Sequence, residues 1–229
     1  MLKNFFIILL LCGLNQFSWS QIKNGKITYI ASFNKDIFLE AKDLDKNMLT
    51  MVNNSYNVQL ELIFIDFQSI CTGIKEMESD LKKGFNITAN FAGYNNIFYF
   101  DKENNYGLKS LAPIDGVNYL MTITTPEWKL TKETKKIGNY ITYKAIQINK
   151  NTKFETIAWY APEIPLSFGP AMYNGLPGLI LEVNSPMINF TATKVSLDNL
   201  KLKQIEKPKG ILISEDEFRK KFGSVFNEN

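Results

Sequence analysis

The side chains that could carry chemistry in this 229-residue chain are carboxylates, because the sequence contains no histidine. The lack of histidine excludes Ser-His-Asp and Cys-His catalytic sites, and it also excludes metal sites built from imidazole. Two carboxyl groups facing each other across a cleft could still hydrolyse a glycosidic bond. The candidate carboxylates are Asp66, Asp101, Asp115, Glu163 and Glu182. Their spacing marks no such pair, and Asp115-Gly116 is typical of a turn, so we expect no catalytic residues.

Cysteine, cofactor and nucleic-acid chemistry are disfavoured as well. Cys71 is the only cysteine beyond the first twenty residues, which predicts a buried, unpaired thiol. The sequence has neither a D-x-D-x-D-G calcium loop nor a glycine loop that cradles phosphate, so we expect no metal ion and no cofactor. Arg219 is the only arginine among 26 basic residues and the net charge is +3, which argues against nucleic-acid binding.

Residues 1–20 have the pattern of a secretory signal peptide. Lys3 supplies a positive charge, residues 5–12 form a short apolar run, and small residues precede a cleavage site after Ser20. Lipidation of Cys12 is disfavoured because a leucine precedes it. No later segment approaches 18 consecutive apolar residues, so we expect no transmembrane span after cleavage. The protein is therefore expected to be exported, and to be periplasmic or associated with an outer membrane.

Residues 21–229 are predicted to form one domain dominated by β-strands. Apolar residues alternate along residues 26–33, which predicts a strand with one buried face. Further strands are predicted at residues 60–70, 97–100, 117–124, 127–131, 140–148, 154–161, 179–183 and 187–195. Short polar or glycine-containing joins between several of them favour antiparallel hairpins.

Short helices accompany the strands. Apolar spacing predicts helices at residues 43–54 and 74–83, and Ser214 with Glu217 forms a capping-box pattern before a C-terminal helix expected to end at Gly223. Several strands are apolar on both faces, which indicates helices on one side and a packed or hollow interior on the other. The predicted fold class is mainly β (α+β): a curved antiparallel sheet, either half-barrel or roll, with two or three short helices.

Residues 162–178 are the most unusual segment of the chain. They contain four of the eight prolines and three of the thirteen glycines, but only one charged residue, Glu163. Prolines restrict the backbone, so such a segment loses less entropy on folding. Its end, Leu176-Pro177-Gly178-Leu179, fits a type II turn with positive φ at Gly178. The segment either closes the core as a rigid loop or presents a preorganised surface or lid to a lipid, a peptide or a partner protein.

The candidate ligand- or partner-binding residues belong to this segment and to the two aromatic residues before it, whose large rings carry polar tips. They are Trp159, Tyr160, Pro162, Glu163, Phe168, Gly169, Pro170, Gly175, Leu176, Pro177 and Gly178.

The sequence AWYAPEIPLSFGP, followed by NGLPGLILEV, resembles the signature of the GLPGLI family, exported Bacteroidetes proteins named after the hexapeptide at residues 175–180. The leader, the opening GKITY and the motif KIGNY also match, so the resemblance covers essentially the whole mature chain. Members often carry a cysteine where this chain has Thr142, which removes any thiol role there. The family has no established activity. The resemblance implies an exported envelope protein of a family that is often considered together with the outer-membrane TonB-dependent transport machinery.

Three classes of function remain. A non-enzymatic binding or accessory module would hold a lipid or peptide, with residues 162–178 at the rim of a curved sheet. A structural or interaction protein would present the same segment to an outer-membrane transport partner. A histidine-free carboxylate hydrolase is the least favoured. An enclosed apolar cavity bordered by Trp159, Tyr160, Phe168 and Leu176 would support the binding module, and solid packing of these side chains with no pocket would oppose it.

Overall fold

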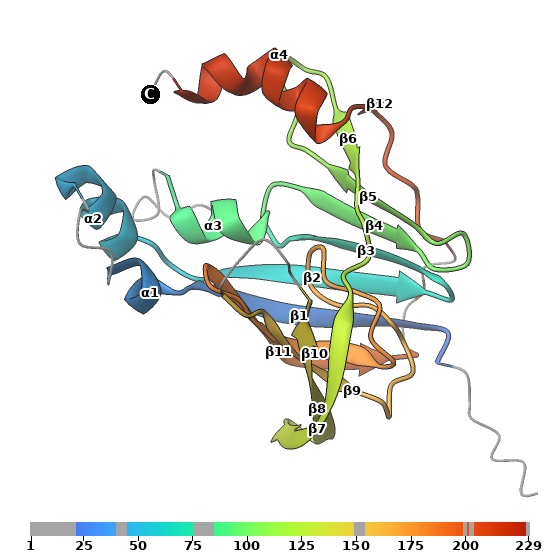
Figure 1. Ribbon diagram of the computed structural model, residues 1–229. Coiled ribbons are helices and arrows are strands. Elements are labelled where there is room, and N and C mark those ends of the chain that lie inside the picture. The colour runs from blue at the N-terminus through green and yellow to red at the C-terminus, as the bar shows by residue number, and fades with distance from the viewer. Residues whose placement is uncertain are drawn as a thin grey trace, which may run out of the picture.

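A single open, curved sheet of twelve strands organises the chain, and helices lie at its margins (Figure 1). The computed structural model describes residues 22–39, 45–75, 85–148, 154–198, 201 and 204–227. The predicted signal peptide and the cleavage site after Ser20 lie outside these residues. The mainly β class and the curved sheet are confirmed.

The strands are β1 (Asn24–Phe33), β2 (Val58–Ile65), β3 (Gln68–Gly73), β4 (Ile97–Asp101), β5 (Tyr106–Ser110), β6 (Tyr119–Thr122), β7 (Trp128–Ile137), β8 (Tyr140–Gln147), β9 (Ile157–Ala161), β10 (Leu179–Asn184), β11 (Ile188–Leu197) and β12 (Ile211–Leu212). The helices are α1 (Lys35–Leu39), α2 (Lys46–Asn53), α3 (Ile87–Ala92) and α4 (Glu215–Asn227). The sheet order is β12-β6-β5-β4-β3-β2-β1-β11-β10-β9-β8-β7. Neighbouring strands are antiparallel except for β12 and β6, which are parallel.

The connection between β6 and β7 forces the sheet to curl. Ten inter-strand steps separate these two strands in the sheet order, so a flat sheet would hold them about 48 Å apart. The chain joins them directly through residues 123–127, and the six Cα–Cα steps from Thr122 to Trp128 span at most about 21 Å. We call residues 123–127 the strap. Figure 1 shows it running in front of the sheet from β6 to β7.

The sequence pattern of the central strands explains their pairing. Ile27, Tyr29 and Ala31 on β1 are buried and alternate with partly exposed residues, as predicted. The predicted strand at residues 60–70 is wrong in one respect: it is a hairpin, with β2 and β3 joined by a tight turn in which Asp66 has φ 50°. Both strands are rich in apolar residues and the turn contains no glycine, so the break was invisible in the pattern.

Two predicted helices are present. The helix predicted at residues 43–54 appears as α2, which begins after Asp45, whose side chain accepts a hydrogen bond from the Met48 amide at 2.8 Å. The capping box before α4 is confirmed, because the Glu217 amide donates to Ser214 Oγ at 3.2 Å. This helix continues to Asn227 instead of ending at the predicted glycine stop.

The helix predicted at residues 74–83 is not supported where it can be judged. Residues 74 and 75 are not helical, and residues 76–83 lie outside the described residues. Helix α3 forms further along, between an N-cap at Asn86 and a C-cap at Gly93, which has φ 65°. Its six residues give too short an apolar pattern to stand out in the sequence.

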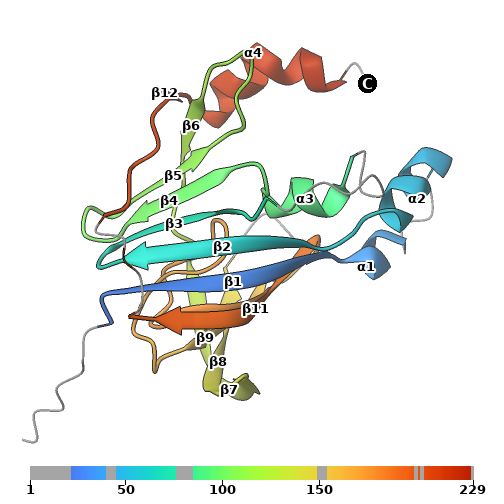
Figure 2. The same ribbon diagram turned by 180° about the vertical axis from the view of Figure 1, so that it is seen from behind.

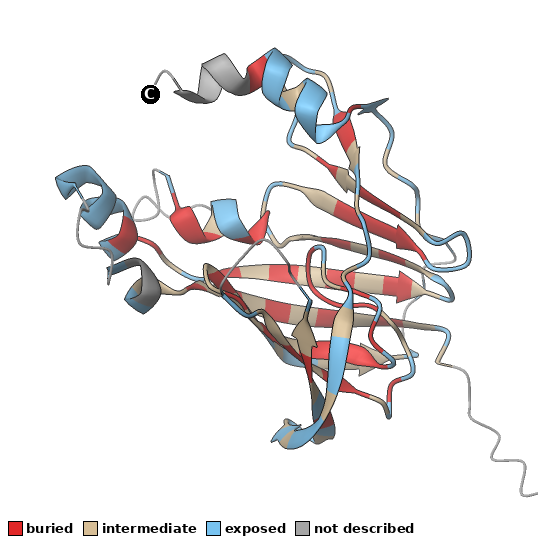
Figure 3. Cartoon of the chain, viewed as in Figure 1, coloured by how far each residue is buried: buried red, intermediate tan, exposed pale blue. Residues whose placement is uncertain are grey.

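The main core lies on the inner face of the sheet. Buried residues alternate along β1 and β2 and recur on β10 and β11 (Figure 3). Viewed from behind, α1 and α2 lie at one end of the sheet, and α4 lies near β6 and β12 (Figure 2). Phe222 of α4 packs edge-to-face on Tyr119 of β6, with ring centroids 5.1 Å apart.

Cys71 belongs to this core, as predicted. Its thiol is 1% exposed, and the Ala171 amide donates to its Sγ at 3.4 Å. Burial raises the pKa of the Cys71 thiol to about 12. The reactive thiolate is therefore scarce in the folded protein at pH 8.

We expect Cys71 in the folded protein to react with a disulfide reagent at pH 8 about 100-fold more slowly than in guanidinium, because reaction requires opening of the core. Absorbance after reagent addition, with and without denaturant, measures both rates. Rapid reaction of the native protein would contradict the burial of this thiol.

Candidate functional site

Residues 162–178, which we call the Pro/Gly loop, pack onto the inner face of the sheet. Buried members are Ile164, Phe168, Gly169, Pro170, Ala171, Asn174, Leu176 and Gly178. The Phe168 ring lies 6.3 Å from the Phe64 ring of β2, centroid to centroid. The loop therefore closes the core, which was one of the two interpretations of its sequence.

Backbone hydrogen bonds hold the loop in one conformation. The amides of Leu179 and Ile180 donate to the carbonyls of Ile164 and Phe168, both at 2.9 Å. The Tyr29 hydroxyl of β1 donates to the Ile180 carbonyl at 2.7 Å inside the core. The loop thus has a backbone fixed by hydrogen bonds as well as prolines that restrict its φ angles. Any ligand that contacts the loop meets a preformed surface.

The strap lies against the outer side of this loop. The Trp128 indole, at the start of β7, donates to the Asn174 carbonyl at 2.8 Å. A Cβ on Gly175 would lie 2.5 Å from Thr125 Cγ2, and Gly175 has φ 89°, so two constraints favour glycine there. Sheet, Pro/Gly loop and strap therefore form successive layers.

The predicted type II turn at the end of the loop is wrong. Gly178 does not have positive φ, and its amide donates to the Leu176 carbonyl at 2.8 Å, which closes a three-residue turn at Pro177. Gly178 is needed for a different reason: a Cβ there would lie 2.4 Å from the Ala161 carbonyl oxygen. Tertiary packing, which local sequence does not reveal, sets this requirement.

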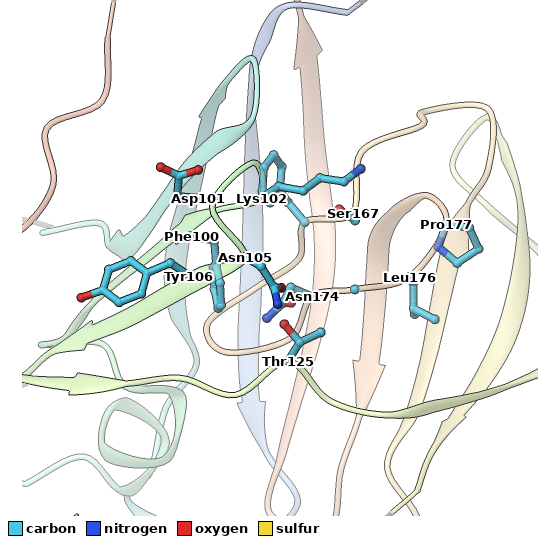
Figure 4. Close-up of a pocket in the computed structure, with 12 residues that line it drawn as sticks. Phe100, Asp101, Lys102, Asn105, Tyr106, Thr125, Ser167, Asn174, Leu176 and Pro177 are labelled. Atoms are coloured by element: carbon cyan, nitrogen blue, oxygen red, sulfur yellow. The ribbon is translucent and has the colours of Figure 1, made fainter. Parts of the chain in front are cut away.

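A pocket of about 480 Å³ opens where the Pro/Gly loop meets the turn between β4 and β5 (Figure 4). Its lining residues come from that turn, the strap and the loop. They are Phe100, Asp101, Lys102, Asn105, Tyr106, Thr125, Ser167, Phe168, Asn174, Gly175, Leu176 and Pro177. The rings of Phe100 and Phe168 with Leu176 are buried and supply an apolar floor, and the other side chains supply a mostly polar rim.

The two charged residues of the rim differ in how they are engaged. The Asp101 carboxylate accepts hydrogen bonds from Asn104 Nδ2 at 2.9 Å, the Asn104 amide at 3.1 Å and Gln68 Nε2 at 3.3 Å. Burial raises the pKa of Asp101, but these hydrogen bonds outweigh it and leave the pKa below its usual value. No ion pair within the described residues involves Lys102.

Four of the eleven candidate binding residues line this pocket. They are Phe168, Gly175, Leu176 and Pro177. Gly169, Pro170 and Gly178 are buried structural members of the loop, and Pro162 is half-buried at its start. Glu163 is exposed, and its carboxylate accepts from the Ile141 amide at 3.4 Å.

Trp159 and Tyr160 do not line the pocket. They are successive residues of β9 and face opposite sides of the sheet, with Tyr160 buried. Trp159 lies in a polar cluster: Lys135 Nζ is 4.4 Å from its ring centroid and 2.6 Å from Glu182 Oε1. The pocket therefore differs from the apolar cavity expected from the sequence: Phe168 and Leu176 border it, polar residues form much of its lining, and Trp159 and Tyr160 lie elsewhere.

Asp66 lies in the β2–β3 turn, next to the turn that follows Asp101, whereas Asp115, Glu163 and Glu182 lie in other segments. Asp66 and Asp115 occupy turns with φ 50°, as expected for the Asp115-Gly116 pair. Glu182 is ion-paired to Lys135, and Asp101 is held by its own turn. Within the described residues, no group of three or more Cys, Asp or Glu side chains could hold a metal ion.

From the other half of the pocket, sequence reasoning had named only Asp101, as a candidate carboxylate and not as a binding residue. The turn at residues 102–105 and Thr125 of the strap are remote from the Pro/Gly loop in the sequence, and only the curl of the sheet brings them together. The turn had a usable signal, because Asn104-Asn105 between two apolar stretches is typical of a hairpin. Asn105 has φ 48° there, which asparagine tolerates.

The Gly178→Ala substitution should lower the free energy of unfolding by about 1–3 kcal/mol, because the added methyl group meets a backbone carbonyl that cannot easily move. Pro177→Ala is the matched control: Pro177 is exposed, so its replacement should cost less than about 1 kcal/mol. Urea denaturation of both variants measures the difference. Equal losses would contradict the close approach at Gly178.

Comparison with known proteins finds one family model, of unknown function, that matches the part of the chain containing the Pro/Gly loop. The model of the family described as "Protein of unknown function (Porph_ging)" matches residues 146–182, which contain the Pro/Gly loop. None of the curated proteins matches the chain. No helix within the described residues is long and apolar enough to cross a membrane.

Two solved structures share the fold. Both are structures of a protein called PNGF-II, one in space group C2 and the other in space group P21. Both have a TM-score of 0.55, with 17% and 16% sequence identity. They cover 90% and 86% of this chain, but this chain spans only 33% and 32% of theirs. At this identity the likeness shows the fold alone.

Proposed function

We propose that this protein is a non-enzymatic binding module of the cell envelope that holds a short peptide segment in the pocket beside the Pro/Gly loop. The observation that carries the proposal is the pocket itself: an apolar floor under a polar rim, built on a loop with a fixed backbone. Its volume of about 480 Å³ lies within the range of about 300–1,000 Å³ typical of ligand sites.

The lining favours a peptide over a lipid chain. The rim carries the side-chain amide of Asn105 and the hydroxyls of Thr125 and Ser167, and the buried Asn174 beside them already donates its Nδ2 to the Met172 carbonyl at 3.0 Å. A peptide backbone offers donors and acceptors to such groups, whereas an acyl chain would remove them from water without hydrogen bonds. A lipid ligand is therefore the second choice.

The burial of the Pro/Gly loop argues against its acting only as an exposed contact surface. Ile164, Phe168 and Leu176, its large aliphatic and aromatic anchors, are at most 2% exposed. An outer-membrane transport protein could still supply the bound peptide segment. A histidine-free hydrolase remains the least favoured function, because Asp101 is held by hydrogen bonds from Asn104 and Gln68 and Glu182 is ion-paired to Lys135.

Export and family assignment are part of the same proposal. The leader of residues 1–20 and the GLPGLI-like block at residues 158–183 support an exported GLPGLI-type protein, and the family match at residues 146–182 covers most of that block. Such a protein would meet its ligand in the periplasm or at the outer membrane.

Removal of the leader is testable by mass. The protein recovered from the envelope of a bacterium that exports it should begin at Gln21 and contain one thiol per chain, because Cys12 leaves with the leader. Intact-mass spectrometry and thiol titration in denaturant measure both. An intact N-terminus, or a lipid attached to Cys12, would contradict cleavage after Ser20.

Peptide binding in the pocket is tested with a substitution that blocks the pocket. A library of random hexapeptides is mixed with the purified protein, and retained peptides are identified by mass spectrometry after ultrafiltration. Thr125→Tyr should weaken binding of the retained peptides by about tenfold or more, because the ring occupies the pocket beside Gly175.

Thr124→Tyr is the matched control. Thr124 is the neighbouring strap residue, is exposed and does not line the pocket, so binding should be unchanged. Equal loss in both variants, or retention of no peptide by the wild-type protein, would refute the proposed site. Retention of phospholipid with no retained peptide would favour the lipid alternative.

A further inference from the structure

We infer that the pocket takes the carboxyl-terminal end of its peptide, with the terminal carboxylate paired to Lys102 and the last side chain on the apolar floor. The inference rests on the proposed peptide-binding function and adds which part of the peptide binds. It depends on three features of the pocket: its charged residues, the combination of surfaces that line it and the rigidity of the turn that carries Lys102.

The charge pattern of the rim favours an anionic group. Lys102 is the only cationic residue that lines the pocket. Figure 4 shows its side chain extending toward the side of Ser167 and Pro177, while the Asp101 carboxylate turns the other way. Asp101 keeps its negative charge but is held by Asn104 and Gln68, so the ammonium group of Lys102 is the charge that a ligand on the side of Ser167 meets.

The combination of surfaces in the pocket favours a chain end. Phe100, Phe168 and Leu176 give an apolar floor, and residues of the Pro/Gly loop, the strap and the β4–β5 turn border it. A carboxyl terminus places a charge, an amide group and a side chain within one residue. A cation on the rim, polar groups beside it and a floor below can bind all three at once.

The turn that carries Lys102 is fixed on both sides. The Lys102 amide donates to the Phe67 carbonyl in the neighbouring turn at 2.8 Å. The Asn105 amide donates back to the Lys102 carbonyl at 3.3 Å. The base of the side chain is therefore held in place, and pairing with a ligand orders only the side chain itself.

The test compares two chemical forms of one peptide library. Hexapeptides ending in Leu, Ile, Val, Met or Phe are made in two forms. One form has a free carboxyl terminus, and the other has a terminal amide and carries a heavy isotope. Both forms compete for the purified protein, and mass spectrometry gives the ratio of retained acid to retained amide. The wild-type protein should prefer the acid by about three- to tenfold at low salt, and less at 0.5 M salt.

Lys102→Met removes the charge and keeps most of the side-chain length, so the acid-to-amide ratio should fall to about one. Glu103→Gln is the matched control, because it changes the neighbouring exposed charge of the same turn, and the preference should persist. Thermal unfolding of each variant checks the fold.

Each outcome separates the inference from the proposed function. If peptides bind and the wild-type ratio is near one, or if Lys102→Met keeps the preference, the carboxyl-terminal assignment is wrong and the peptide site stands. If laurate displaces every retained peptide and the protein binds laurate more tightly, the carboxylate belongs to an amphiphile, and both the peptide assignment and this inference fail. If neither form is retained, the proposed function fails.

Discussion

The shortness of the strap is the constraint on which the rest of this structure depends. A flat sheet would place β6 and β7 about 48 Å apart, yet five residues join them. The sheet must curl until those strands approach each other, and the curl creates an interior that needs filling. The Pro/Gly loop fills it, with Phe168 and Leu176 on the sheet side and Gly175 under the strap. The pocket is the space that remains at one end.

The glycines and prolines of the loop serve this layered arrangement in different ways. Gly178 allows the backbone to approach Ala161, and Gly175 allows both a positive φ and contact with Thr125. The glycines and prolines that stand out in the sequence of the Pro/Gly loop therefore allow the loop to pack between the sheet and the strap. Its conspicuous residues are mostly structural, and the polar residues that could contact a ligand come largely from segments without a conspicuous pattern.

Local sequence patterns predicted those structural features that depend only on neighbouring residues. The alternation on β1, the capping box at Ser214 and the Asp115-Gly116 turn all depend on neighbouring residues, and all are present. The turn at Asp66 escaped prediction because apolar residues continue on both sides of it. In the candidate site, the loop residues were found from composition, whereas Lys102, Asn105 and Thr125 were not. These residues meet the loop only through the order of the strands, which no local pattern encodes.

The pairing of β1 with β11 has a consequence for how the chain reaches its native state. These two strands lie at the centre of the sheet, yet Gly25 is paired with Leu197, almost at opposite ends of the described chain. A topology of such high contact order folds slowly, since distant segments must meet before the core gains stability. During synthesis β1 emerges well before β11 and has to wait for it. Until then the apolar faces of β1 and β2 are exposed, and aggregation competes with folding.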